Sequence, residues 1–103
     1  MPTLTAVAKT EDVPAGKMKV FTSGKLKIAL CNVDGTYWAI EDVCTHDDGP
    51  LGEGKLDGGT AECPRHGGRF DVKTGAAVRM PAIVPVRTFP VKVEGGQVFV
   101  EVG

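Results

Sequence analysis

Two short cysteine–histidine pairs are the residues of this sequence best suited to chemistry. One residue separates Cys44 from His46, two separate Cys63 from His66, and 16 residues lie between the pairs. These are the two histidines of the chain. Thiolate and imidazole together suit a borderline or soft metal such as iron or zinc. Glycines follow both pairs and let the backbone curl closely around a bound centre. The spacing therefore predicts a metal centre with four protein ligands.

Three interpretations of these four residues compete. Two cysteines and two histidines are also a zinc set, but zinc fingers typically pair Cys with Cys and His with His. Here each short pair is mixed. A disulfide between Cys44 and Cys63, beside two incidental histidines, is the third interpretation, and it suits a chain with three cysteines poorly. The mixed pairs argue against a zinc finger, while the residue types alone leave iron and zinc open.

The pattern resembles the Rieske family, whose signature is Cys-X-His and then, after a gap of about this length, Cys-X-X-His. The match runs from Cys44 to about Asp71. The resemblance implies one [2Fe–2S] cluster, with Cys44 and Cys63 on one iron and His46 and His66 on the other. It also implies that the imidazoles lie near the surface, where electrons leave. Two neutral imidazoles raise the midpoint potential to roughly −150 to +300 mV, against about −400 mV for all-cysteine plant-type ferredoxins.

Departures from one branch of that family predict where in this range the potential falls. Rieske proteins of respiratory and photosynthetic cytochrome complexes join their two cluster loops by a disulfide, and the matching positions here are Gly49 and Arg65. Those proteins also donate hydrogen bonds to sulfur from a serine and a tyrosine, where this chain has Gly68 and Phe70. Because the reduced cluster is then less stabilised, we expect a potential near the negative end of the Rieske range.

A short chain of this kind resembles the Rieske ferredoxin of bacterial multicomponent oxygenases that hydroxylate aromatic rings. That resemblance implies a one-electron carrier between a flavin-dependent NAD(P)H reductase and a terminal oxygenase, in aromatic hydrocarbon catabolism. We expect no catalytic residues, because no histidine remains to build the mononuclear iron site of the oxygenase itself. The alternatives are the small subunit of an assimilatory nitrite reductase and a Rieske redox protein of another pathway.

Short alternating apolar runs predict strands throughout the chain, and no stretch keeps a helical period. Asp34 and Gly35, between two such runs, predict a hairpin, and Gly95 and Gly96 predict a second. The expected strands cover residues 17–21, 25–31, 37–40, 54–56, 60–62, 69–72, 86–94 and 98–102. The fold class is therefore all-β: a single Rieske-type domain over residues 1–103, an antiparallel sandwich or barrel. A loop-rich cluster-binding subdomain is expected at about residues 42–85.

The segment of residues 81–85 is bracketed by prolines and suits an interior strand poorly. The resemblance implies that it packs over the cluster as a covering loop. Leu51 and Pro81 are predicted apolar lids, with ordinary loop packing as the alternative. Some charged residues are candidate docking contacts, with ordinary solvated charges as the alternative: Asp47, Asp48, Glu53, Arg65 and Arg79.

We predict structural roles for Cys31, Tyr37 and Trp38. Cys31 lies in an alternating strand with no histidine near it in sequence, which indicates a buried thiol. Tyr37 and Trp38 are predicted strand aromatics that pack a core.

The chain as a whole has an ordinary globular composition. Of its 103 residues 42% are hydrophobic and 24% are charged, and the formal net charge is −1. No basic stripe suggests nucleic acid, and no apolar run is long enough for a membrane span. An odd number of cysteines and the lack of a secretory signal at the start favour the cytoplasm. No long amphipathic segment suggests an obligate partner, so a monomer is expected.

Overall fold

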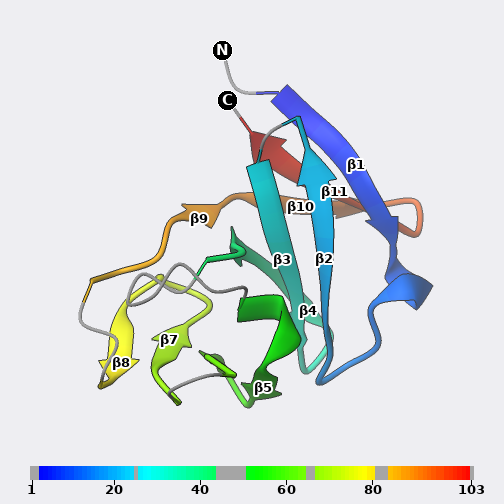
Figure 1. The fold of residues 1–103 in the computed structure, drawn as a ribbon. Coiled ribbons are helices and arrows are strands. Elements are labelled where there is room, and N and C mark those ends of the chain that lie inside the picture. The colour runs from blue at the N-terminus through cyan, green and yellow to red at the C-terminus, as the bar shows by residue number, and fades with distance from the viewer. Residues whose placement is uncertain (1–2, 25, 44–50, 65–66, 81–83, 103) are drawn as a thin grey trace.

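The computed structural model describes residues 3–24, 26–43, 51–64, 67–80 and 84–102 and has three antiparallel sheets (Figure 1). The strands are β1 (Thr3–Lys9), β2 (Met18–Ser23), β3 (Leu26–Val33), β4 (Thr36–Glu41), β5 (Lys55–Asp57), β6 (Thr60–Glu62), β7 (Arg69–Asp71), β8 (Ala77–Arg79), β9 (Thr88–Phe89), β10 (Val91–Glu94) and β11 (Gln97–Val102). Two short 3₁₀ turns, η1 (Thr10–Asp12) and η2 (Leu51–Glu53), complete the described elements. The all-β prediction is confirmed.

The central sheet has the strand order β2-β3-β4-β9 and forms the middle layer of the molecule. Its hairpin between β3 and β4 turns at Asp34 and Gly35, where the backbone φ angles are 52° and 89°. Two successive positive φ angles match the twist of the flanking strands, so the predicted Asp-Gly hairpin is confirmed. Asn32 secures this turn, because its Oδ1 accepts from the Gly35 N–H at 2.8 Å.

The other two sheets pack on opposite faces of the central sheet. The terminal sheet joins the two ends of the chain in the order β1-β11-β10, and the inserted sheet has the order β5-β6-β7-β8. Figure 1 shows β7 and β8 at the lower left, β5 at the bottom, and β1 and β11 at the upper right, with β3 between them.

Strand β3 is buried on both faces because each face meets a different core. Ala29 and Cys31 enter the core shared with the inserted sheet, which we call the inner core. Ile28 and Leu30 enter the core shared with the terminal sheet, together with Val98 of β11. This alternation explains why a strand with period-two patterning has no solvent-facing side through its middle.

Several element boundaries differ from the sequence predictions. The expected strand of residues 86–94 is two strands, β9 and β10, because Pro90 lacks the N–H needed to continue the ladder. Strands β1 and β8 were not predicted. All the strands of the inserted sheet fall within residues 42–85, while the division into a subdomain stays a prediction. In the described part of the chain, no helix is long and apolar enough to span a bilayer.

Candidate metal centre

Cys63 is the predicted ligand that the structure describes, and it lies at the end of the β6–β7 hairpin. Its side chain is 1% exposed, carries a free thiol, and belongs to the inner core. The Cys63 N–H donates to the Gly68 carbonyl at 2.7 Å, and the Gly67 N–H donates to the Cys63 carbonyl at 3.1 Å. These two bonds hold the ends of the Cys63–His66 motif close together. The other predicted ligands, Cys44, His46 and His66, lie outside the described residues, as do Gly49 and Arg65.

The surroundings of Cys63 suit the thiolate ligand of an iron–sulfur cluster. Cys63 borders a hollow of about 290 Å³, which Gly54, Pro64 and Gly67 also line. A Cβ atom at Gly54 would collide with the backbone carbonyl of Glu62, so this approach of η2 to the hairpin requires glycine. Close backbone packing and a water-poor sulfur environment are both typical of Fe–S sites. The described residues hold no group of three potential metal ligands.

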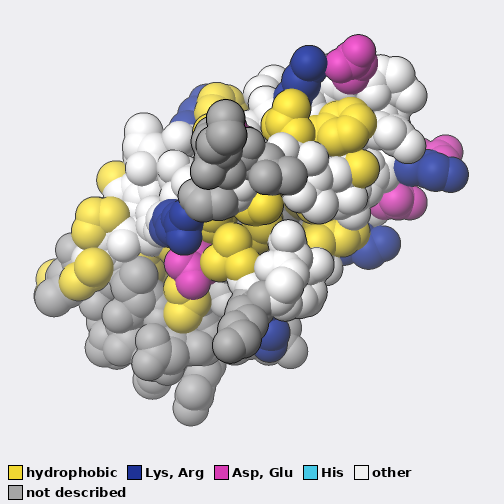
Figure 2. All heavy atoms as spheres, turned by 90° about the horizontal axis from the view of Figure 1, so that it is seen from above, with side chains coloured by type: hydrophobic (Ala, Val, Ile, Leu, Met, Phe, Trp, Pro, Cys, Tyr) yellow, Lys and Arg dark blue, Asp and Glu magenta, His cyan; other side chains and the backbone are white. Residues whose placement is uncertain are grey.

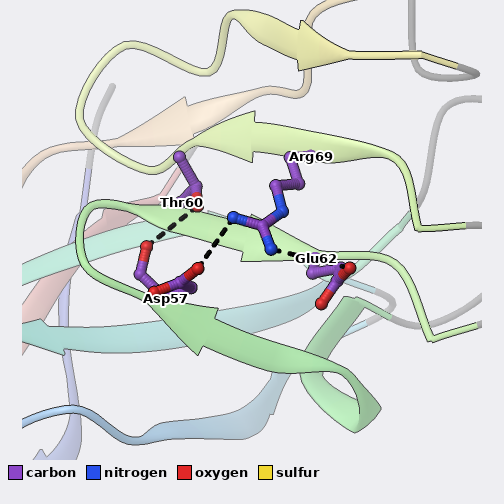
Figure 3. A network of polar contacts seen from close by, with 4 residues as sticks. All are labelled: Asp57, Thr60, Glu62 and Arg69. Carbon is purple, nitrogen blue, oxygen red and sulfur yellow. Dashed lines mark hydrogen bonds and ion pairs between the residues drawn. The ribbon is translucent and has the colours of Figure 1, made fainter.

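An ion-pair network on the outer side of the inserted sheet stiffens this hairpin (Figure 3). Arg69 Nη1 lies 2.8 Å from Asp57 Oδ2, and Arg69 Nη2 lies 3.7 Å from Glu62 Oε1. The Thr60 hydroxyl donates to the Asp57 carbonyl at 2.9 Å. Glu62, which directly precedes Cys63, is the register partner of Arg69, which directly follows Gly68. Because Asp57 is 65% exposed, the pair contributes below about 1 kcal/mol, and its main effect is on hairpin geometry.

The inner core lies directly beneath this hairpin. Leu51 and Phe70 are fully buried in it together with Cys63. The role of Leu51 as a lid stays a prediction, and Pro81 lies outside the described residues. Arg79 is exposed on β8, whereas the Asp47, Asp48 and Glu53 side chains are not described.

The structural predictions for the remaining cysteine and aromatics are confirmed. Cys31 is fully buried, and burial, followed by the nearby charge of Asp42, raises the pKa of its thiol to about 12. Trp38 packs against the inner core. Tyr37 packs against the other core and donates from its hydroxyl to the Thr10 carbonyl at 2.7 Å.

Asp42 was not singled out from the sequence. It is a buried carboxylate, 8% exposed, two residues before Cys44. Burying a charged side chain costs free energy unless it is paired or hydrogen-bonded, so a buried carboxylate is expected to have a partner. An acidic residue in front of a predicted ligand was the available signal, but its hydrogen-bond partner could not be inferred without the fold.

Comparisons with known proteins agree with the predicted centre. The Rieske [2Fe–2S] domain profile matches residues 3–90. The chain is 43% identical over 98 residues to the ferredoxin component of biphenyl 2,3-dioxygenase from Rhodococcus jostii, covering 95% of this chain and 92% of that protein.

Two solved structures are similar over nearly the whole chain. The ferredoxin of Sphingomonas yanoikuyae B1 superposes with a TM-score of 0.92 at 34% identity, covering 98% of this chain and all of that one (100%). The second comes from a complex of reduced oxygenase and oxidized ferredoxin in carbazole 1,9a-dioxygenase. It has a TM-score of 0.90 at 38% identity and covers 94% of this chain and 91% of that one.

Proposed function

The chain belongs to the Rieske [2Fe–2S] family, and we propose that it passes electrons from a flavin-dependent NAD(P)H reductase to a terminal oxygenase that acts on aromatic compounds. It carries a Rieske [2Fe–2S] cluster and is an electron-transfer ferredoxin, not itself catalytic. The observation that carries the proposal is the 43% identity to a dioxygenase ferredoxin component over 95% of the chain.

The proposed ligands are Cys44 and Cys63 for one iron, and His46 and His66 for the other. When bound, the cluster supplies one-electron redox chemistry. The buried position of Cys63 and the two backbone bonds that close its loop support its assignment. The chain contributes a preformed hairpin and excludes water from the Cys63 sulfur.

Phe70 and Gly68 support a low midpoint potential for this carrier. Phe70 lies in the inner core beside Cys63 and offers no hydroxyl, and Gly68 contributes its carbonyl to the Cys63 N–H. Without hydroxyl donors at these two positions, we place the midpoint near the negative end of the Rieske range, about −150 mV.

Partner proteins dock transiently near His46 and His66. Three exposed apolar side chains close to the covering segment support an apolar contact there: Val78 and Met80 lie before residues 81–83, and Val84 lies after them, with exposed fractions of 53%, 77% and 54%. On the face shown in Figure 2, hydrophobic side chains reach the surface in several places among charged ones. Such a mixed surface suits a transient complex.

The carrier works as a monomer in the cytoplasm, without nucleic acid or membrane as partners. The buried free thiol of Cys31 supports a reducing compartment. The identity to the biphenyl dioxygenase ferredoxin favours a dioxygenase ferredoxin. It gives less support to the two alternatives, a nitrite reductase small subunit and a Rieske protein of another pathway.

Reconstitution tests this function. The chain is mixed with NADH, the flavoprotein reductase and the terminal oxygenase of a biphenyl dioxygenase system, and the dihydroxylated product is measured. Product formation should depend on the chain and should be lost with the Cys63→Ala variant. Oxygen-dependent product from the isolated chain, or no transfer from the prereduced chain to the oxygenase, would contradict the carrier role.

A further inference from the structure

The carboxylate of Asp42 connects the two ends of the first predicted ligand segment. Its Oδ1 accepts a hydrogen bond from the Gly52 N–H at 2.6 Å. Asp42 directly precedes, and Gly52 directly follows, the stretch of residues 43–51 that contains Cys44 and His46. We call this bond the Asp42–Gly52 clasp. A short hydrogen bond from an N–H to a buried carboxylate is about twice as strong as a neutral one.

Each side of the clasp is fixed to a different part of the fold. On the first side, the Asp42 N–H donates to the Lys27 carbonyl of β3 at 2.9 Å, and the Glu41 N–H donates to the Arg87 carbonyl at 2.8 Å. Asp42 is therefore held on the central sheet. These bonds fix the backbone from which the carboxylate reaches Gly52.

The other side of the clasp is fixed by the inner core. Leu51 is fully buried there with Cys63, and its carbonyl accepts from the Gly54 N–H at 3.0 Å. Gly52 lies tightly against Val20 of β2, because a Cβ atom at this position would collide with the Val20 Cγ2 atom. The clasp thus joins the central sheet to the core that holds the described ligand.

We propose that Asp42 is a positioning residue for the cluster. By holding Gly52, it fixes the separation of the two ends of the segment that carries the proposed ligands Cys44 and His46. This inference rests on the proposed ligand assignment. Ligand geometry at metal centres depends on supporting hydrogen bonds of this kind.

A second effect of Asp42 must be separated from positioning. Its negative charge lies close to the inner core, because it acts on the Cys31 thiol. Loss of that charge would stabilise the reduced, more negative cluster and raise the midpoint potential. Asp42→Asn removes the charge but keeps an oxygen acceptor for the Gly52 N–H, whereas Asp42→Ala removes both. A change in a measured property that both variants share is therefore an effect of the lost charge. A change found only in Asp42→Ala is an effect of the lost hydrogen bond to Gly52.

The experiment compares holo proteins of wild type, Asp42→Ala, Asp42→Asn and Asp12→Ala. Asp12→Ala is the matched control, because its carboxylate also accepts from a backbone N–H, that of Lys9 at 2.9 Å, but at η1. Three properties are measured: the rate of cluster loss to excess EDTA from the visible absorbance, the electron paramagnetic resonance (EPR) spectrum after dithionite reduction, and the midpoint potential. Asp42→Ala should lose its cluster about tenfold faster than wild type, equivalent to about 1.4 kcal/mol, and should change the principal g values. Asp12→Ala should keep the wild-type rate and g values, and Asp42→Asn, which keeps a weaker neutral bond, should lie much closer to wild type than Asp42→Ala.

Gly52→Ala perturbs the clasp from its other side and covers the case in which Asp42→Ala does not fold. Its Cβ must displace Val20 and would lie 3.1 Å from Asp42 Oδ1, so it should also accelerate cluster loss. Cluster loss and g values equal to wild type in both Asp42→Ala and Gly52→Ala would overturn the positioning role. So would an equal acceleration of cluster loss and an equal change of g values in Asp42→Ala and Asp42→Asn. A wild-type protein without a Rieske EPR signal would instead refute the ligand assignment itself.

Discussion

Replacement of Gly75 by alanine should destabilise the fold more than the same change at a matched glycine, because Gly75 joins the inserted sheet to the segment before β9. The Gly75 N–H donates to the Asp71 carbonyl at 2.7 Å, and the Gly75 carbonyl accepts from the Val86 N–H at 2.8 Å. Its φ angle is +80°. A Cβ atom at Gly75 would collide with the Val86 carbonyl oxygen and would lie 3.0 Å from Thr88 Cγ2.

The magnitude follows from a comparison with Gly96. Gly96 has nearly the same φ angle, +76°, but a Cβ atom there meets nothing within 4 Å. Each alanine therefore carries the left-handed backbone strain of about 1–2 kcal/mol. Gly75→Ala adds the clash with backbone, which by analogy with overpacking costs about 1–3 kcal/mol more. A difference of about 2 kcal/mol corresponds to a Tm about 8–16 °C lower for Gly75→Ala than for Gly96→Ala.

Thermal unfolding of the two variants, followed by circular dichroism under identical conditions, measures this difference. Iron content is determined in the same samples, because Gly75 also holds residue 86, close to the predicted covering segment of residues 81–85. Equal Tm values for the two variants would refute the packing of Gly75 against Val86 described above.

Three further perturbations have expected outcomes. The native protein keeps a proton on Cys31, whose pKa is about 12, whereas the unfolded chain loses this proton above about pH 9. The free energy of unfolding should therefore fall as the pH rises above about 9, by at most about 1.4 kcal/mol per pH unit. Cys31→Ala should flatten this dependence in urea unfolding between about pH 9 and pH 11; an unchanged slope would assign it to other groups. Phe70→Tyr should raise the midpoint potential in a redox titration, because it adds a hydroxyl donor at this position; an unchanged or lowered value would show that such a donor does not set the potential here. Asn32→Ala should lower the free energy of unfolding by about 1–3 kcal/mol, because it removes two hydrogen bonds of about 0.5–1.5 kcal/mol each, to the Val13 carbonyl and from the Gly35 N–H, while the Val13 carbonyl keeps the Tyr37 hydroxyl as a donor; a loss below about 0.5 kcal/mol would contradict this.

The parts of the fold that local sequence determines could be predicted. Asp34 and Gly35 specify a hairpin by backbone preference alone, and alternation marked β2, β3 and β4 within a few residues. Strand β1 could not be predicted, because its ladder depends on β11 at the opposite end of the chain. The break at Pro90 was available in the sequence, since proline cannot donate to a ladder, and the predicted continuous strand was wrong there.

The ligand types and their spacing could be predicted from the sequence, but the supporting contacts could not. The Cys-X-X-His motif is local, and its chemistry depends on residue type. The Asp42–Gly52 clasp joins residues ten positions apart, and the Gly75–Val86 bond joins residues still further apart. Both depend on how the inserted sheet packs against the central sheet. That packing is a property of the inner core as a whole and leaves no local pattern.

Pulsed EPR of the dithionite-reduced protein tests the central claim most directly, because it detects the nitrogen nuclei coupled to the reduced iron. The predicted result is a rhombic [2Fe–2S] signal with couplings from two histidine nitrogens, together with loss of the intact cluster in a His66→Ala variant. A colourless, EPR-silent protein that contains zinc, or a [2Fe–2S] signal without nitrogen couplings, would contradict the assignment of Cys44, His46, Cys63 and His66 as the ligands of a Rieske cluster.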